Sequence, residues 1–182
     1  MTDIGIAVEG ESDKKIVSEI LRKLDTDAYI VLPPRPRNKN GIYAHLEKII
    51  FGKLRGYRKI IILVDYDNSK KWENKFKSKT DGLKKKPDAK NKKIILHFAT
   101  QNIEAWLLGC YPNILKDIRN RNPDEVIDPV SWIETAERKK RKDKNFRYNK
   151  TAEGKRIAER NELMHFRNSK SFKEFELKIK DC

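Results

Sequence analysis

The sequence is short of cysteine and of long apolar runs, and each shortage excludes a class of protein. Cys110 and Cys182 stand far apart and form no Cys-x-x-Cys pair, so we expect two plain thiols and neither a disulfide framework nor a zinc knuckle. The longest unbroken apolar run covers residues 60–64, whereas a membrane span needs about 20 residues. Met1 is followed by no basic-then-apolar leader, so we expect a cytoplasmic protein with no membrane partner.

The excess of positive charge is confined to two segments. Residues 68–93 carry 11 basic and 3 acidic side chains, and residues 138–150 carry 8 and 1. The two excesses equal the whole formal net charge of +15, which suggests an anionic partner such as DNA or RNA. Lysine enrichment of solvated faces is the alternative. The residues expected to bind nucleic acid are Lys84, Lys85, Lys86, Arg138, Lys139, Lys140 and Arg141.

Apolar segments alternate with amphipathic ones in the first half of the chain. Strands are expected at residues 4–8, 28–32, 59–64 and 94–98, with helical patterns between them. This order predicts an α/β fold, in which a parallel sheet of about four strands is flanked by helices. We expect residues 1–110 to form this α/β core and residues 111–182 to form a helical extension packed on it.

Acidic residues follow three of the expected strands. Glu9 follows the first, Asp65 and Asp67 close the third, and Glu104 lies six residues after the fourth. Because parallel strands end at one edge of a sheet, these carboxylates can share a pocket, and the period of two in a strand would aim Asp65 and Asp67 the same way. Clustered carboxylates favour a hard divalent cation, Mg²⁺ or Mn²⁺.

Each of these acidic residues also has a structural explanation. Glu9 could cap the next helix, Asp13 could complement the dipole of that helix, and Asp65 with Asp67 could start a turn. The three histidines of the chain show no metal-ligand spacing, which argues against zinc. The joint placement of the acids after successive strands favours the functional interpretation.

Two motifs resemble those of a known family. Residues 8–13 (Val-Glu-Gly-Glu-Ser-Asp) and 61–67 (Ile-Ile-Leu-Val-Asp-Tyr-Asp) are similar to the signature motifs of the TOPRIM domain, which topoisomerases, primases and OLD-type nucleases share. The spacing between Glu9 and Asp13, and residues 102–107 (Asn-Ile-Glu-Ala-Trp-Leu), resemble the stand-alone OLD-type TOPRIM-like group. The resemblance covers about residues 3–108.

The resemblance implies a TOPRIM-like sheet and a magnesium- or manganese-dependent nuclease that acts in defence against mobile elements. Its metal ligands would be Glu9, Asp13, Asp65, Asp67 and Glu104. Its catalytic residues would be Glu9, Asp65 and Asp67 with Lys150, the last stabilising charge on the phosphate. The chain lacks the ATPase half usual in OLD nucleases, so it would act alone or with a separately encoded ATPase partner.

Two other functions fit parts of the pattern. The chain could be a nucleic-acid-binding or regulatory TOPRIM-like module that breaks no bond. It could also be a phosphoacceptor or phosphatase with Asp65 as nucleophile, although the net charge of +15 fits that poorly. For either nucleic-acid function, we expect both basic segments to flank the carboxylates, because residues 68–93 leave the sheet directly after Asp67.

Overall fold

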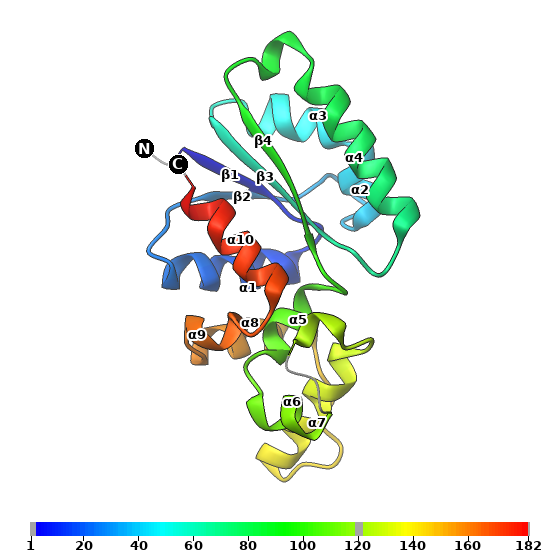
Figure 1. Ribbon diagram of the computed structural model, residues 1–182, viewed down its shortest axis with the longest axis vertical. Helices are drawn as coiled ribbons and strands as arrows, with labels where there is room; N and C mark the ends of the chain where they lie inside the picture. Colours follow the sequence, from blue (N-terminus) through cyan, green and yellow to red (C-terminus); the bar gives the residue numbers. More distant parts are fainter. Residues whose placement is uncertain (1–2, 119–121, 182) are drawn as a thin grey trace.

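The computed structural model describes residues 3–118 and 122–181, so Cys182 lies outside the described residues. Four strands form one sheet in the order β2-β1-β3-β4, and every neighbouring pair is parallel (Figure 1). The strands are β1 (Ile4–Ala7), β2 (Tyr29–Val31), β3 (Lys59–Asp65) and β4 (Lys93–Ala99). The predicted α/β fold with a parallel sheet of four strands is confirmed.

The central strand β3 shows why the sheet is covered on both faces. Its side chains alternate, with Ile61 and Leu63 on one face and Ile60, Ile62 and Val64 on the other, and all five are almost fully buried. Two separate apolar clusters meet these two rows. A strand buried on both faces has no polar alternation, which is the pattern that its sequence shows.

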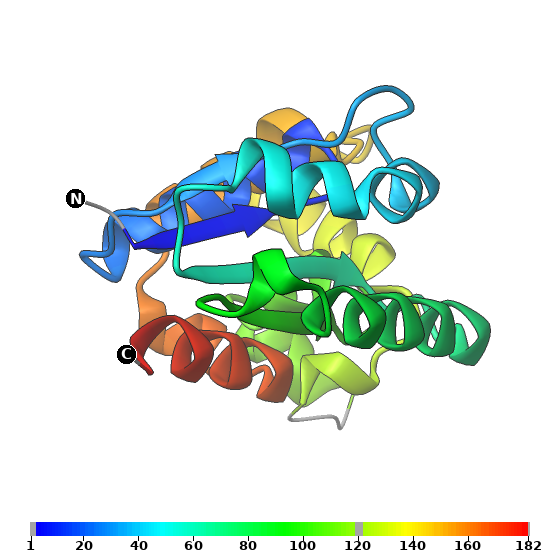
Figure 2. The ribbon, with the colours of Figure 1, turned by 90° about the horizontal axis from the view of Figure 1, so that it is seen from above.

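Helices form one layer on each face of the sheet (Figures 1 and 2). One layer holds α2, α3, η1 and α4, whose apolar residues belong to the same cluster as the even-numbered side chains of β3. The other layer holds α1 and α10 (Lys170–Lys180), and α8 (Lys150–Arg160) packs against α1. The helices α5 (Ile103–Leu108) and α7 (Pro129–Arg141) lie beyond the sheet. In the first half of the chain the helices are α1 (Glu11–Lys23), α2 (Lys39–Ala44), α3 (Leu46–Lys48), η1 (Ile49–Lys53), α4 (Lys70–Lys84) and η2 (Pro87–Ala89).

The second half is helical and shares the core of the sheet. Its helices are α5 (Ile103–Leu108), α6 (Pro112–Asp117), η3 (Pro123–Glu125), α7 (Pro129–Arg141), α8 (Lys150–Arg160), α9 (Leu163–Phe166) and α10 (Lys170–Lys180). One apolar cluster extends from Ile6 in β1 to Ile179 in α10. Trp106 is fully buried in it, and its indole N–H donates a 2.8 Å hydrogen bond to Ser171 Oγ. The helices therefore complete the hydrophobic core on one face of the sheet.

Two sequence expectations concern features other than the sheet. Cys110 is a buried free thiol. Over residues 3–118 and 122–181, no helix has the length and apolar character needed to cross a membrane.

Candidate functional site

Charged side chains gather at the edge where the four parallel strands end. Glu9 lies two residues after β1, Asp65 is the last residue of β3, and Glu104 is the second residue of α5, which follows β4. Lys39 begins α2, the helix that follows β2. Because all four strands run the same way, these positions share one edge, as expected for a ligand site in an open parallel sheet.

The ammonium group of Lys150 lies among three carboxylates. Its Nζ is 3.0 Å from Asp13 Oδ1, 3.2 Å from Glu104 Oε1 and 3.6 Å from Asp65 Oδ2. Glu104 is 2% exposed, whereas a third of the Lys150 side chain is accessible to solvent. The structure therefore joins four positions that are far apart in the sequence.

Close packing of α8 against α1 brings Lys150 to this place. Lys150 is the first residue of α8. Asn149 caps the N-terminus of this helix, because its side-chain oxygen accepts hydrogen bonds from the backbone N–H groups of Thr151 and Ala152. One turn later lies Gly154, where an added Cβ would stand 2.8 Å from Ile16 Cδ1 and 2.9 Å from the hydroxyl of Tyr148. A glycine at this position lets the two helices approach closely.

Three of the acidic side chains use one oxygen to fix the backbone. Asp13 Oδ2 accepts a hydrogen bond from Gly10 N (3.0 Å), and Asp65 Oδ1 accepts one from Ile103 N (2.9 Å). Glu9 Oε1 accepts one from Asp65 N (2.8 Å). Asp13 thus caps its helix while its other oxygen faces Lys150, so the structural role and a functional role coexist. Such bonds orient the remaining oxygens before any ligand arrives.

Burial perturbs the ionisation of the cluster. Burial raises the pKa of Glu9 to about 7, against the opposing effects of the hydrogen bond from Asp65 N and of nearby Lys39. Burial also raises the pKa of Asp65 and of Glu104, although Lys150 lowers both. Burial by itself would lower the pKa of Lys150, but its carboxylate neighbours raise it. The negative charge of the carboxylates is therefore only partly neutralised, because one ammonium group is the counter-ion of several of them.

Asp67 lies at the rim of the cluster and not beside Asp65, so the two side chains do not share one direction as expected, although the charge of Asp67 is close enough to Glu9 to raise the pKa of Glu9. The chain leaves the extended conformation there, with φ of 47° at Asp67 and 51° at Asn68. The side chain of Asp67 is 55% exposed and forms an ion pair with Lys39 at the rim of the site. The period of two holds only while the strand continues, and β3 ends at Asp65.

Three further side chains belong to the surroundings of the site and were not predicted from the sequence. Lys39 pairs with Asp67, and Arg37 pairs with Glu11 at the start of α1. The hydroxyl of Tyr148 is buried near Glu104 and Lys150. The sequence does carry a signal for the two cations, since they follow β2 at the same edge of the sheet.

The side chains of the cluster offer only oxygen atoms as possible metal ligands, which is the ligand type that a hard cation prefers. Asp13 Oδ1 is paired with Lys150, and the buried Tyr148 Oη has no hydrogen-bond partner among the described residues. The ammonium group of Lys150 already occupies the place where these carboxylates attract a positive charge. In the described part of the chain, however, no three such groups are already arranged as ligands around one point. A metal ion would have to take over the oxygens that now face Lys150.

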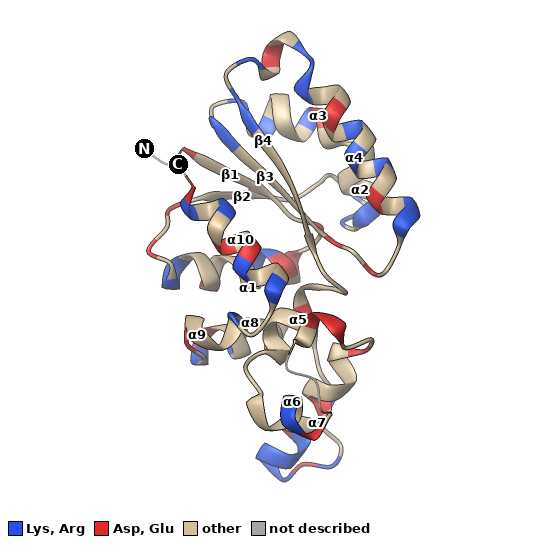
Figure 3. Ribbon diagram, viewed as in Figure 1, with Lys and Arg blue, Asp and Glu red and all other residues tan. Residues whose placement is uncertain are grey.

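The first basic segment does not flank the site with the lysines expected to bind nucleic acid. Lys84, Lys85 and Lys86 lie at the C-terminal end of α4, and only the start of that helix is near Asp67 (Figure 3). With 15 residues at about 1.5 Å each, α4 places them roughly 20 Å away. Lys86 pairs with Glu47. The beginning of residues 68–93 thus lies beside the carboxylates, as expected from connectivity, whereas the triplet lies away from them, because a crossover helix runs back toward the amino ends of the strands.

The second basic segment is divided between internal ion pairs and solvent. Arg138 pairs with Glu134. Arg141 pairs with Glu153, which lies one turn beyond Lys150 on α8. The other two predicted contacts, Lys139 and Lys140, are exposed at the end of α7 (Figure 3). These two lysines are therefore available to an external anion.

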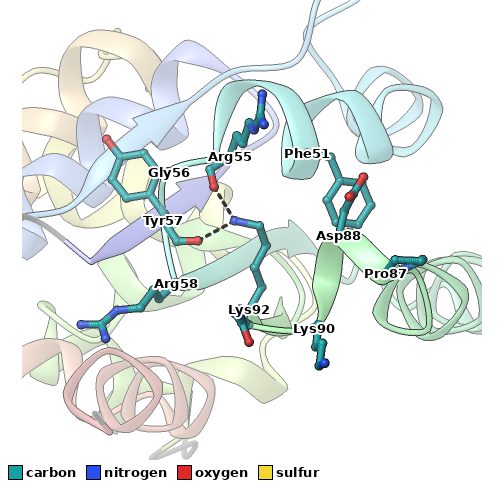
Figure 4. A pocket seen from close by; sticks show the side chains of 10 residues that line it. Phe51, Arg55, Gly56, Tyr57, Arg58, Pro87, Asp88, Lys90 and Lys92 are labelled. Atoms are coloured by element: carbon teal, nitrogen blue, oxygen red, sulfur yellow. Dashed lines mark hydrogen bonds between the residues drawn. The ribbon is translucent and has the colours of Figure 1, made fainter.

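A hollow of about 680 Å³ opens at the opposite end of the sheet, where β3 and β4 begin (Figure 4). Basic residues line it, but Lys92 already donates hydrogen bonds to the carbonyl oxygens of Arg55 and Tyr57. Arg58 pairs with Asp3. This hollow shares no residue with the carboxylate cluster.

Fold and site together define an α/β protein with a buried carboxylate cluster at the ends of its parallel strands. The chain belongs to the family described as a domain of unknown function, DUF4276, which matches residues 8–180. That match includes every residue of the cluster and nearly all of the C-terminal helices. Neither a curated protein nor a solved structure matches the chain.

Proposed function

We propose that the protein is a metal-dependent nuclease with a TOPRIM-like site, which hydrolyses phosphodiester bonds of DNA or RNA. The observation that supports this best is the convergence of Asp13, Asp65 and Glu104 on Lys150, with Glu9 bonded to the backbone of Asp65. Residues with perturbed pKa values that gather at the ends of parallel strands are typical of active sites.

Mg²⁺ or Mn²⁺ would be held by Glu9, Asp13, Asp65 and Glu104, with Asp67 at the rim. Divalent ions bound to carboxylates supply a hydroxide-like nucleophile and stabilise the leaving oxygen. The chain contributes the orientation of the ligand oxygens, through the hydrogen bonds that occupy one oxygen each of Glu9, Asp13 and Asp65.

The cations of the site would bind the phosphate group. Lys150 lies at the first turn of α8 with a third of its side chain accessible to solvent, and its ammonium group is the one that a phosphate oxygen would approach. Lys39 and Arg37 lie at the rim, each bound to a single carboxylate. An ammonium group beside the phosphate offsets the charge that develops on its oxygens during displacement.

A specific observation also favours a second function, that of a nucleic-acid-binding or regulatory module without catalysis. Lys150 already serves as a counter-ion to three carboxylates, so the cluster can exist in a folded protein without a metal. In that function the exposed Lys139 and Lys140 would carry the binding. The two functions differ in whether the cluster binds Mg²⁺ or Mn²⁺ at all.

The test combines cleavage with metal binding. The purified chain is incubated with labelled DNA and RNA at varied Mg²⁺ and Mn²⁺, and Mn²⁺ binding is measured by calorimetry. Asp65→Asn is the informative variant, since the amide oxygen can still accept the hydrogen bond from Ile103 N. Asp88→Asn is the control, because Asp88 is an exposed carboxylate at the other end of the sheet.

We expect metal-dependent cleavage that Asp65→Asn abolishes and Asp88→Asn leaves unchanged, with Mn²⁺ binding weakened only in the first variant. Nucleic-acid binding without cleavage or metal binding would instead establish the second function. Cleavage that persists in Asp65→Asn would place the active site elsewhere.

A further inference from the structure

The outer edge of β4 is an open strand edge. β4 is the last strand in the order β2-β1-β3-β4, and no further strand of the described residues pairs with it. Hydrogen bonds from Lys93 N to Arg58 O and from Tyr66 N to Ala99 O show that its odd-numbered residues bond to β3. In a parallel ladder the alternate residues point the other way, so the N–H and C=O groups of Ile94, Leu96 and Phe98 face outward.

This edge lacks the features that usually protect a free strand. β4 has seven residues in unbroken register with β3, without a bulge, and its sequence contains neither proline nor glycine. Ile95, Leu96 and Phe98 are only partly buried. A groove of about 510 Å³ runs along the strand between α4 and α10, which lie on either side of β4 in Figure 1. The groove is therefore shaped to receive another extended segment.

Charges along the α4 wall of the groove alternate in sign. The order along the helix is Glu73, Lys77, Asp81 and Lys84. Because α4 runs antiparallel to β4, Glu73 lies toward the end of the strand and Lys84 toward its beginning. A twofold axis through Leu96 would therefore set Glu73 against Lys84 of a second copy, and Lys77 against Asp81.

The wall of the groove that α10 forms also carries side chains of opposite charge. Glu174 and Lys178 line the groove one turn apart, and a twofold axis between them would set each against the other in a second copy. Leu177, next to Lys178, is a large apolar side chain that is 67% exposed. Both walls are thus complementary to themselves when the strands are antiparallel, as an isologous interface requires.

We infer that two copies of this chain associate through β4, as antiparallel edge strands that continue the sheet to eight strands. The outward backbone groups of Ile94, Leu96 and Phe98 would pair across the axis, and like helices would lie side by side on each face. Since the strands are antiparallel, the two carboxylate clusters would lie at opposite ends of the joined sheet. This association does not depend on the proposed nuclease function.

A charge swap on α4 tests the inference with exposed residues. Asp81→Lys would set two lysines against each other across the axis, and Lys77→Glu would set two acids. The double variant restores opposite charges in both symmetry-related pairs. Within one chain, Lys77 forms an exposed ion pair with Glu73, and Asp81 forms one with Lys84, and such pairs contribute little to folding. Lys155→Glu, on an exposed part of α8, is the control.

Association is measured by sedimentation equilibrium, and exposure of β4 by amide exchange of residues 93–99 in concentrated and dilute solution. We expect a dimer that each single variant weakens by about tenfold, that the double variant restores and that Lys155→Glu leaves unchanged. Amides of Ile94, Leu96 and Phe98 should exchange faster on dilution. A monomer at all concentrations, a dimer insensitive to Asp81→Lys, or exchange independent of dilution would each overturn the inference, as would binding of a peptide from another protein to a monomeric chain.

Discussion

Replacing Lys150 by methionine tests the geometry of the cluster most directly. Methionine has a similar length and no charge, so the change removes the cation and keeps most of the packing. In the metal-free protein, Asp13, Asp65 and Glu104 would then face one another without a counter-ion. We expect a clear loss of stability whose size depends on pH.

The magnitude follows from the distances between Lys150 Nζ and the three carboxylate oxygens, which are 3.0, 3.2 and 3.6 Å. At an effective dielectric constant of about 20, each pair is attracted by roughly 5 kcal/mol before hydration is considered. Loss of one partner from a buried ion pair costs about 3–5 kcal/mol net. We therefore expect Lys150→Met to lower the free energy of unfolding by about 3–5 kcal/mol at pH 8.

The loss of stability caused by Lys150→Met should be smaller in mild acid. The pKa values of Asp65 and Glu104 are already raised, and removing the lysine raises them further. The folded variant then binds more protons than its unfolded chain, so its stability falls as pH rises and recovers as pH falls. Each proton that the folded variant takes up restores about 1.4 kcal/mol of its free energy of unfolding per pH unit of acidification.

Urea unfolding in the presence of a chelator, at pH 8 and pH 5.5, measures this effect. Lys155→Met on the same helix is the control, since Lys155 is exposed. Mn²⁺ is then titrated into each protein. If the ion and the ammonium group of Lys150 share oxygens, the Lys150 variant should bind Mn²⁺ at least about tenfold more tightly, which corresponds to 1.4 kcal/mol. Unchanged stability at pH 8 would refute the role of Lys150 as counter-ion, and unchanged Mn²⁺ affinity would refute the shared site.

Three further predictions concern helix packing, acid stability and the rim of the site. Gly154→Ala should destabilise the protein by about 1–2 kcal/mol in thermal unfolding, because its Cβ would overlap α1, whereas Gly82→Ala in open space should stabilise it by up to about 1 kcal/mol. Burial opposes ionisation of Glu137, but hydrogen bonds to its carboxylate lower its pKa to about 2. The ionised carboxylate should therefore contribute up to about 3 kcal/mol to the free energy of unfolding, and this contribution should be lost as pH falls from about 4.5 to 2. In urea titrations, Glu137→Gln should flatten that pH dependence. Lys39→Ala should reduce the slope of log affinity for DNA against log salt by about one, whereas Lys85→Ala should leave turnover of short oligonucleotides unchanged.

The sheet and the edge that carries the site were predictable from the sequence. An apolar run such as residues 60–64 has no polar alternation, and it is too short for a buried helix, so a central strand is the best interpretation. Once the strands are parallel, connectivity alone places Glu9, Asp65 and Glu104 at one edge. These predictions depend on local patterns and on chain direction, which the sequence contains directly.

Other parts of the site depend on tertiary packing. The sequence does not show that β3 ends at Asp65 and that Asp67 adopts a positive φ, because aspartate at that position is compatible with strand or turn. The position of Lys150 depends on how closely α8 approaches α1, where Gly154 lies next to Ile16. These two residues are more than 130 positions apart in the sequence, so no local pattern could have shown that they are neighbours. The distance of Lys85 from the site could have been predicted, since a crossover helix between parallel strands must run back along the sheet.

The protein contains a second buried ionic cluster, and the contrast between the two bears on function. Glu137 is fully buried, accepts hydrogen bonds from Tyr111, Arg141 and Arg160, and has a lowered pKa. Two guanidinium groups and a hydroxyl satisfy this one carboxylate, which is what a stabilising network requires. At Lys150 the proportions are reversed, since one ammonium group serves three carboxylates, and the buried hydroxyl of Tyr148 beside them has no hydrogen-bond partner among the described residues. A cluster that served only stability would be expected to resemble the first, so the shortage of positive charge at the second favours a site completed by an external cation.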